Sequence, residues 1–250
     1  MQGICAHPII VHPDTERLAE AVAERWIALC RVAQTQRGVF HVALSGGSTP
    51  RRLYRLLAET GYRARIDWSR VCLYFGDERA VPPAHADSNF RMAREALLAH
   101  IDIPTDNVLP MYADPARIHE DAAAYAELLR ARLPGDADGM PVFDLILLGM
   151  GADGHTCSLF PDTPILQERR QPVAAVHVAQ LDSWRLSLTY PVLDAARQLL
   201  FMVAGSDKAA MLRRICREPA GQPPVPVQGI RPRGAVEWHL DRAAAAELDA

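Results

Sequence analysis

Strand-like and helix-like segments alternate along most of this chain, and that alternation restricts its fold more than any other feature. Short apolar runs typical of buried strands occupy residues 39–44, 71–75, 143–148 and 199–204. Between them, apolar residues recur at helical spacing over residues 14–36, 50–58, 87–100 and 118–133. Such alternation predicts an α/β fold with a mostly parallel sheet and helices on both faces.

The remaining segments complete this pattern without a break between domains. A further strand is expected before the first helix, for which Asp14 is the candidate N-cap. Further strands are expected at residues 173–179, 186–189 and 236–240, with a helix at 207–216, a proline-rich loop at 222–226 and an alanine-rich helix at the end. Because no repeat or linker interrupts the series, we predict a single domain over residues 1–250.

Composition excludes several classes of function. The 250 residues carry a formal net charge of −3, which provides no broad basic surface for nucleic acid or anionic membranes. No apolar run approaches the ~20 residues that span a bilayer, and the first 13 residues do not resemble a signal peptide. The cysteines are odd in number and scattered, which argues against a zinc site or disulfide scaffold and for reduced thiols in a cytoplasm: Cys5, Cys30, Cys72, Cys157 and Cys216.

Four of the expected strands end in polar turns that contain glycine. These turns cover residues 45–49, 76–79, 149–155 and 205–208. In open parallel sheets, ligands bind beyond the carboxyl ends of the strands. The sequence therefore predicts a site at which these turns meet.

The first turn, Ser45-Gly46-Gly47-Ser48-Thr49, favours an anion site. Its glycines let the backbone approach a ligand, and the following helix offers free N–H groups and the positive end of its dipole. A tight turn with Thr49 as N-cap is the alternative, but it explains neither the two glycines nor the three hydroxyl groups. No Walker motif is present, so the turn is not a nucleotide-binding P-loop.

The second turn places Asp77, Glu78 and Arg79 directly after a buried strand. As a cluster at a strand end, these charges favour a site that holds an acid and a cation near a polar substrate. An ordinary surface loop would account for them equally well. Ser88 and Asn89 are expected to cap the next helix rather than to bind ligand.

The third turn begins with the glycine spacing of a dinucleotide-binding fold, G-x-G-x-x-G over residues 149–154. That fold needs a full helix after the glycines, whereas Pro161 and Pro164 leave only a short segment beyond Gly154. Asp153 would also repel a pyrophosphate. These features exclude NAD binding.

Instead, this turn presents Asp153 followed by His155. Histidine is the side chain best suited to proton transfer near neutral pH, and the pair lies at the end of a buried strand. A histidine that caps a short helix or packs in the core is the alternative. The position of the pair favours a functional role.

Two cations are candidate anion ligands. Lys208 is the only lysine among 27 basic residues, and it is expected in the first turn of a helix, where the dipole disfavours a cation unless an anion shares the site. Coding bias that left one surface lysine explains it equally well. Arg185 begins the run "RLSLTY", although an arginine at a strand edge is often simply solvated.

Taken together, five segments closely resemble the 6-phosphogluconolactonase branch of the glucosamine-6-phosphate isomerase/6-phosphogluconolactonase superfamily. They are "SGGSTP", "GDERAV" with "DSN", "GMGADGHTCSLFP", "RLSLTYPVLDAARQLLFMVAGSDKAAML" and "VEWHLDRAAA". The resemblance spans roughly residues 10–245 and implies a Rossmann-like three-layer sandwich. It implies hydrolysis of 6-phospho-D-glucono-1,5-lactone to 6-phosphogluconate, the second step of the oxidative pentose phosphate pathway, by a monomer or homodimer with no metal or organic cofactor.

The same resemblance implies a role for each site residue. The residues implied to bind the substrate phosphate are Ser45, Gly46, Gly47, Ser48, Thr49, Arg185 and Lys208. His155 is the implied general base that takes a proton from water as it attacks the lactone carbonyl, and Asp153 orients its imidazole. Asp77 and Arg79 line the sugar end, with Arg79 a candidate for stabilising the oxyanion. Cys157 stands where the family more often has alanine, and we expect no catalytic thiol.

Two alternative functions remain to be weighed against the lactonase. Glucosamine-6-phosphate deaminases resemble this chain, but that branch carries an acidic residue a few positions after its histidine, whereas no carboxylate follows His155 before Asp162. A non-catalytic sugar-phosphate sensor would need an attached DNA-binding domain, and the 38 residues before the strand at Val39 predict only one strand and one helix. Both features favour the lactonase.

Overall fold

The core of the fold is a six-stranded parallel sheet, seen in a computed structural model that describes residues 7–217 and 225–248. Its strands, in spatial order, are β1 (Ile9–His12), β9 (Ala235–Asp241), β8 (Gln198–Val203), β5 (Leu145–Leu148), β2 (Phe40–Leu44) and β3 (Val71–Phe75). Every neighbouring pair runs parallel. The expected parallel α/β sheet is therefore confirmed.

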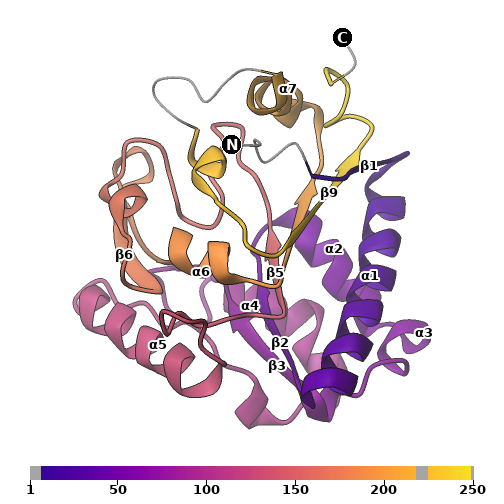
Figure 1. Cartoon of the computed structure of the whole chain (residues 1–250), viewed down its shortest axis with the longest axis horizontal. Coiled ribbons are helices and arrows are strands. Elements are labelled where there is room, and N and C mark those ends of the chain that lie inside the picture. The colour runs from indigo at the N-terminus through magenta and orange to yellow at the C-terminus, as the bar shows by residue number, and fades with distance from the viewer. Residues whose placement is uncertain (1–6, 218–224, 249–250) are drawn as a thin grey trace.

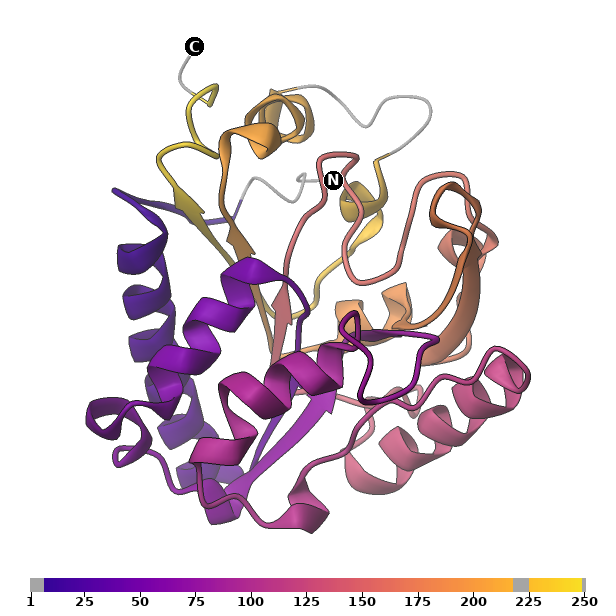
Figure 2. The ribbon, with the colours of Figure 1, turned by 180° about the vertical axis from the view of Figure 1, so that it is seen from behind.

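Helices lie on both sides of this sheet (Figure 1). One layer packs α1 (Thr15–Arg37), α2 (Ser48–Ala58) and α4 (Asn89–Ala96) side by side, as the reverse view in Figure 2 also shows. The other side carries α5 (Ile118–Arg132) and α6 (Tyr190–Ala195), while α7 (Ala209–Arg217) lies near the top of the view. A single turn of helix, α3 (Thr60–Arg63), comes after α2. The arrangement confirms the predicted three-layer sandwich.

A second, smaller sheet lies beside the first, and the sequence did not predict it. It consists of β4 (Asp77–Arg79), β7 (Ser183–Leu188) and β6 (Val173–Val178), all antiparallel. The expected strands at 173–179 and 186–189 belong to this sheet. Because β4 is three residues long and wholly charged, it carries no hydrophobic alternation by which it could be recognised.

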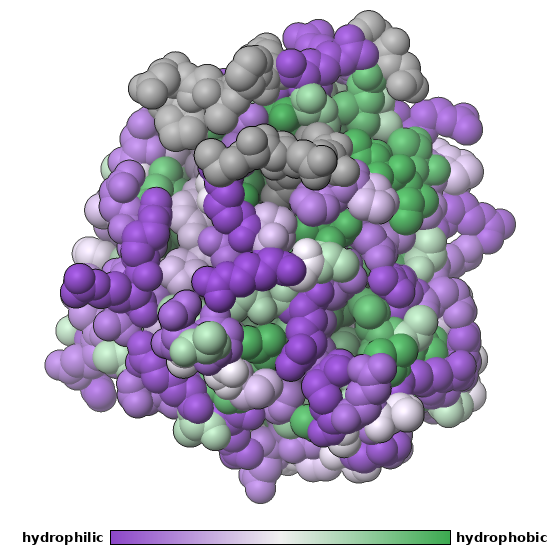
Figure 3. Space-filling model, in the orientation of Figure 1, coloured by the Kyte–Doolittle hydropathy of each residue, from purple (hydrophilic) through white to green (hydrophobic). Residues whose placement is uncertain are grey.

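The core is built from the continuous apolar runs of the strands. Every residue of β5 and β8 is buried, as expected for strands covered on both faces. Aromatic contacts support this core: Trp26 of α1 meets Phe40 of β2 edge-on, and within the sheet Phe201 of β8 stacks on Trp238 of β9 with centroids 3.9 Å apart. Hydrophilic side chains cover most of the face shown in Figure 3.

Helix α1 begins and ends as its sequence indicates. Asp14 is the N-cap, and its carboxylate accepts a hydrogen bond from the Arg17 N–H at 2.8 Å. Gly38 closes the helix with a positive φ of 84°, a conformation that favours glycine. The prediction of a helix over residues 14–36 is thus confirmed to within a residue at each end.

Three expectations require correction or concern residues that are not described. The prediction of an alanine-rich closing helix is wrong, because residues 242–247 form turns. Cys30, Cys72 and Cys157 are free thiols, but Cys216 is disulfide-bonded, so the expectation of reduced cysteines throughout is wrong. Most of the proline-rich loop at 222–226 lies outside the described residues. Among the described helices, none is long and apolar enough to cross a membrane.

Candidate active site

The candidate site lies at the topological switch point of the large sheet, where the strand order reverses. Strands β2 and β5 are adjacent and parallel; the chain proceeds outward from β2 to β3 on one side, and from β5 to β8 on the other. Ligands bind at such a switch point, beyond the carboxyl ends of the strands. A cavity of about 370 Å³ opens there.

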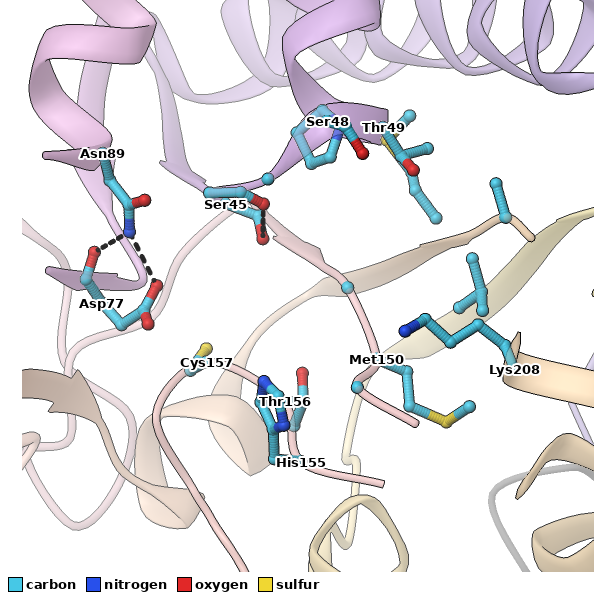
Figure 4. A pocket seen from close by; sticks show the side chains of 18 of the residues that line it. Ser45, Ser48, Thr49, Asp77, Asn89, Met150, His155, Thr156, Cys157 and Lys208 are labelled. Atoms are coloured by element: carbon cyan, nitrogen blue, oxygen red, sulfur yellow. Dashed lines mark hydrogen bonds between the residues drawn. The ribbon is translucent and has the colours of Figure 1, made fainter. Parts of the chain in front are cut away.

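This cavity gathers predicted residues from five separate parts of the chain, several of which are labelled in Figure 4. Its lining includes Ser45, Gly46, Gly47, Ser48, Thr49, Asp77, Arg79, His155, Arg185 and Lys208. Asp153 is the one predicted residue outside the lining, and it contacts His155 instead. The four strand-end turns therefore meet as the sequence predicts.

The turn after β2 is shaped for close approach to a ligand. Gly47 is the N-cap of α2, with φ 105°, so the helix starts at Ser48 and the expectation that Thr49 is the cap is wrong. A Cβ on Gly46 would overlap the side-chain amide of Asn89. The buried Tyr54 fixes the turn, because its hydroxyl bonds both the N–H and the carbonyl of Ser45. The N–H groups at the start of α2 thereby face the cavity from a rigid support.

The turn after β5 carries the His–Asp pair. His155 Nδ1 lies 2.6 Å from Asp153 Oδ1, and the His155 main-chain N–H also donates to that oxygen. Burial alone would raise the pKa of Asp153, but the hydrogen bonds and charge of His155 outweigh it, so the pKa lies below its usual value. The His155 side chain is 30% exposed, and its Nε2 is the ring nitrogen left for a ligand or water.

Turns rather than a helix come after this pair, as the two prolines predicted. Residues 150–163 form no helix, and the next helical turn is a 3-10 segment at Pro164–Gln167. Gly154 has φ 79°, and a Cβ there would overlap Val225. The alternative in which His155 caps a short helix or packs in the core is thus excluded.

The small sheet contributes two cations that face the cavity. Arg79 of β4 and Arg185 of β7 are directly paired across the antiparallel ladder. Burial, with the charge of Arg79 adding to it, lowers the pKa of Arg185. The Nε atoms of both side chains are buried and have no hydrogen-bond partner among the described residues. Both side chains line the cavity, and each keeps one unsatisfied buried donor.

Asp77 is held in place rather than free to move. It is 7% exposed; one carboxylate oxygen accepts from Ser158 Oγ at 2.7 Å and the other from Asn89 Nδ2 at 3.2 Å. Its neighbour Glu78 is also buried, which raises the pKa of that carboxyl, and accepts bonds from three main-chain N–H groups. The surface-loop interpretation of this cluster is therefore wrong.

Asn89 is a site residue that sequence reasoning assigned only to a helix cap. Ser88 makes the cap, accepting from the Arg91 N–H, whereas Asn89 lines the cavity. Its amide oxygen accepts from Arg79 at 2.6 Å while its nitrogen donates to Asp77. The only signal was its place in the "DSN" segment, which is part of the family resemblance.

Lys208 enters the cavity from the turn after β8. It ends a 3-10 turn, Ser206–Lys208, immediately before α7 rather than within its first turn, and its side chain is 21% exposed. Asp207 lies 2.8 Å from Nζ. The preceding Gly205 donates its N–H to the buried carboxylate of Asp241, which anchors the turn. The view of Lys208 as a chance surface lysine does not fit this position.

Cys157 also lines the cavity. Burial raises the pKa of its thiol well above the usual value, which keeps it protonated. Its φ of 50° is unusual for a residue other than glycine. Within the described residues, no cluster of three or more histidine, cysteine or acidic side chains is arranged to hold a metal ion.

The fold and the cavity together define an open α/β protein with a polar cavity at its switch point, lined by a glycine-rich turn, by cations and by the histidine of a His–Asp pair. Residues 13–238 match the family described as glucosamine-6-phosphate isomerases/6-phosphogluconolactonase, and the chain belongs to this family.

Relatives named 6-phosphogluconolactonase cover most of the chain. The protein from Rattus norvegicus is 44% identical, covering 91% of this chain and 87% of its own length. That from Synechocystis is 39% identical, covering 94% and 90%. The 6-phosphogluconolactonase structure from Trypanosoma brucei is 30% identical, with a TM-score of 0.87 and coverage of 97% and 98%. A monomeric glucosamine-6-phosphate deaminase, 18% identical with a TM-score of 0.80 and coverage of 96% and 99%, shares the fold.

Proposed function

We propose that this protein hydrolyses 6-phospho-D-glucono-1,5-lactone to 6-phospho-D-gluconate, the second step of the oxidative pentose phosphate pathway. The names of its relatives support the reaction and substrate. The observation that carries the proposal is that His155, hydrogen-bonded to Asp153, and the Ser45–Thr49 turn line one cavity of about 370 Å³. A phosphosugar can occupy both ends of such a cavity at once.

The phosphate end is formed by main-chain groups and two cations. The N–H groups at the start of α2 and the hydroxyls of Ser48 and Thr49 offer donors to phosphate oxygens. Lys208 and Arg185 supply positive charge from two other elements. Because most of these donors sit on rigid turns, little ordering is required when the anion binds.

The chemical end is formed by His155. With Nδ1 held by Asp153, Nε2 accepts a proton from a water molecule as the water oxygen attacks the lactone carbonyl carbon. Asp153 stabilises the imidazolium so formed. The tetrahedral intermediate collapses by breaking the bond to the ring oxygen, which takes the proton back from His155. The products are a carboxylic acid, which ionises, and a free hydroxyl.

Arg79 is the group we assign to the developing oxyanion. One of its terminal nitrogens donates to Asn89 Oδ1 and to the Asp87 carbonyl, which fixes the guanidinium of this cavity-lining residue. A fixed donor stabilises the charge that appears in the transition state without reorganisation. Asp77, with both oxygens hydrogen-bonded, is assigned to holding Asn89 and the sugar rather than to proton transfer.

The setting of the reaction is part of the same proposal. We place the protein in the cytoplasm, as a monomer or homodimer that takes a phosphosugar lactone and no nucleic acid. The proposed steps use only His155, fixed hydrogen-bond donors and water, so they assign no role to a metal or organic cofactor.

The test is a coupled assay on freshly prepared phosphogluconolactone. The 6-phosphogluconate formed is oxidised by its dehydrogenase, and NADPH is recorded after subtraction of spontaneous lactone opening. We expect rapid turnover of the phosphorylated lactone and much weaker turnover of unphosphorylated glucono-1,5-lactone. A rate equal to the uncatalysed background would refute the proposal, and release of ammonia from glucosamine 6-phosphate would favour the deaminase alternative.

A further inference from the structure

One face of the His155 imidazole rests on an aromatic ring that no step above uses. The rings of His155 and Phe160 are stacked, with centroids 4.0 Å apart and an angle of 23° between their planes. Phe160 is only 7% exposed and does not line the cavity. It therefore contacts the base without facing the ligand.

The same ring also contacts a cation of the site. The guanidinium carbon of Arg185 lies 5.5 Å from the centroid of the Phe160 ring, within the range of a cation–π interaction. Arg185 and His155 come from strand β7 and from the turn after β5, which are far apart in sequence. Phe160 is thus a common support for the proposed base and one proposed phosphate ligand.

The chain around Phe160 is fixed on several sides. Thr163 Oγ1 donates to the Phe160 carbonyl at 2.6 Å, and the Leu159 N–H donates to the Thr156 carbonyl at 3.0 Å. Ser158 joins the segment to the small sheet, because its hydroxyl donates to Asp77 and its N–H to Ser187 Oγ. The ring consequently has a defined position relative to both β4 and β7.

Stacking supplies a restraint that Asp153 alone does not. The hydrogen bond to Asp153 holds one edge of the imidazole, but a single edge contact leaves the ring free to tilt about that bond. A flat ring packed against its face opposes this tilt and so fixes the direction of Nε2. Displacement of a reacting group by about 1 Å costs on the order of a hundredfold in rate.

We propose that Phe160 is a positioning residue of this site, which acts on turnover through His155 and on substrate affinity through Arg185. The inference rests on the proposed lactonase reaction. This positioning role requires the flat face of an aromatic ring, and an apolar side chain of similar size does not provide it.

Three variants separate this role from general packing. Phe160→Leu keeps an apolar side chain without a flat face, and Phe160→Tyr restores the ring. Ile165→Ala is the matched control, because Ile165 is equally buried in the same segment and has no ring to stack. Phe160→Met, which also lacks a ring, replaces the leucine variant if the latter is insoluble.

For Phe160→Leu we expect kcat to fall about tenfold or more and KM to rise about 2- to 30-fold, as displacement of the base and loss of a cation–π contact imply. Phe160→Tyr should stay within about twofold of wild type in both constants, since its ring can still stack. Ile165→Ala should lower Tm while kcat and KM stay near the wild-type values.

The outcomes are distinct from failure of the proposed function. If the wild-type protein shows no lactonase activity, the proposed reaction itself is wrong. If the wild type is active and Phe160→Leu matches it in kcat and KM, the positioning role is overturned. Equal kinetic losses in Phe160→Leu and Ile165→Ala, or no recovery in Phe160→Tyr, would overturn it as well.

Discussion

Two glycine-rich turns at adjacent strand ends differ in role because only one of them opens into a helix. The turn after β2 leads into α2, an 11-residue helix, and presents N–H groups and hydroxyls to the cavity. The turn after β5 leads into no helix over residues 150–163, and presents a histidine with its carboxylate partner. The strands themselves are neighbours in register, Val42 beside Leu145.

The difference shows how one scaffold separates binding from chemistry. A helix N-terminus supplies fixed partial charge and N–H donors for an anion, and the hydroxyls of Ser48 and Thr49 add to these donors. A turn without a helix exposes its side chains and offers no positive helix end to a carboxylate such as Asp153, which pairs with His155 instead. Substitutions in the two turns should therefore affect different kinetic constants.

The largest effect is expected at the chemical turn. His155→Ala should lower kcat by about 10²–10⁴ with little change in KM, because it removes a positioned base but no phosphate ligand. Steady-state kinetics by the coupled assay, corrected for spontaneous opening, measures this.

A matched control exists within the small sheet. His177 also lies near an aspartate, Asp182, at 3.3 Å, yet does not line the cavity. His177→Ala should leave kcat unchanged. Normal turnover by His155→Ala would mean that the base is another group.

The next largest effect is expected at the binding side. Lys208→Ala should raise KM for the phosphorylated lactone about 10- to 100-fold and alter kcat much less, since a hydrogen bond to a charged group contributes about 1.5–3 kcal/mol. Kinetics with the unphosphorylated lactone should show no such change in KM. Arg213→Ala, which removes an exposed ion pair between α7 and Glu247, is the control. A loss confined to kcat would place Lys208 in the chemistry instead.

A smaller effect is expected on stability rather than on rate. Gly154→Ala should lower the free energy of unfolding by about 1–3 kcal/mol, because alanine at φ 79° is strained and its Cβ would overlap Val225. Gly61→Ala, a helical position with open space, should be neutral or stabilising. Denaturant unfolding of both variants provides the measurement, and equal stabilities would contradict the strain assigned to this turn.

The smallest effect is a pH dependence that arises from Asp153. The pKa of this carboxyl is lower in the folded state than its ordinary value of 3.8. Its contribution to stability is therefore full above that value and is lost as the pH falls through the lower folded value. As the pH falls from about 5 to about 3, Tm should fall slightly more steeply for the wild type than for Asp153→Asn. Identical slopes would show that the pair contributes little to folding.

Much of the large sheet could be predicted because its strands are continuous apolar runs. Residues 71–75 were expected as a strand and form β3, and residues 39–44 differ from β2 by a single residue. A continuous apolar run of this kind is typical of a strand that is buried on both faces of a sheet. The order of turns along the chain then predicted which residues meet at the site.

The parts that could not be predicted depend on contacts between distant residues. The pairing of Arg79 with Arg185 and the bridging role of Asn89 depend on the register of a sheet whose shortest strand is wholly charged. At the end of the chain, alanine favours a helix by propensity, and the Asp241 carboxylate accepts from the N–H of Ala244 as an N-cap would, yet residues 242–247 form turns. Local preference is overridden in both places.

The side-by-side arginines of the antiparallel ladder have a consequence for the unliganded protein. Arg79 and Arg185 repel each other in a partly dry environment, and neither Nε has a hydrogen-bond partner among the described residues. Negative charge on a bound ligand relieves that repulsion, and this relief adds to the free energy of binding. Substrate and product should accordingly raise the Tm of this enzyme, because binding offsets a repulsion between two of its own side chains.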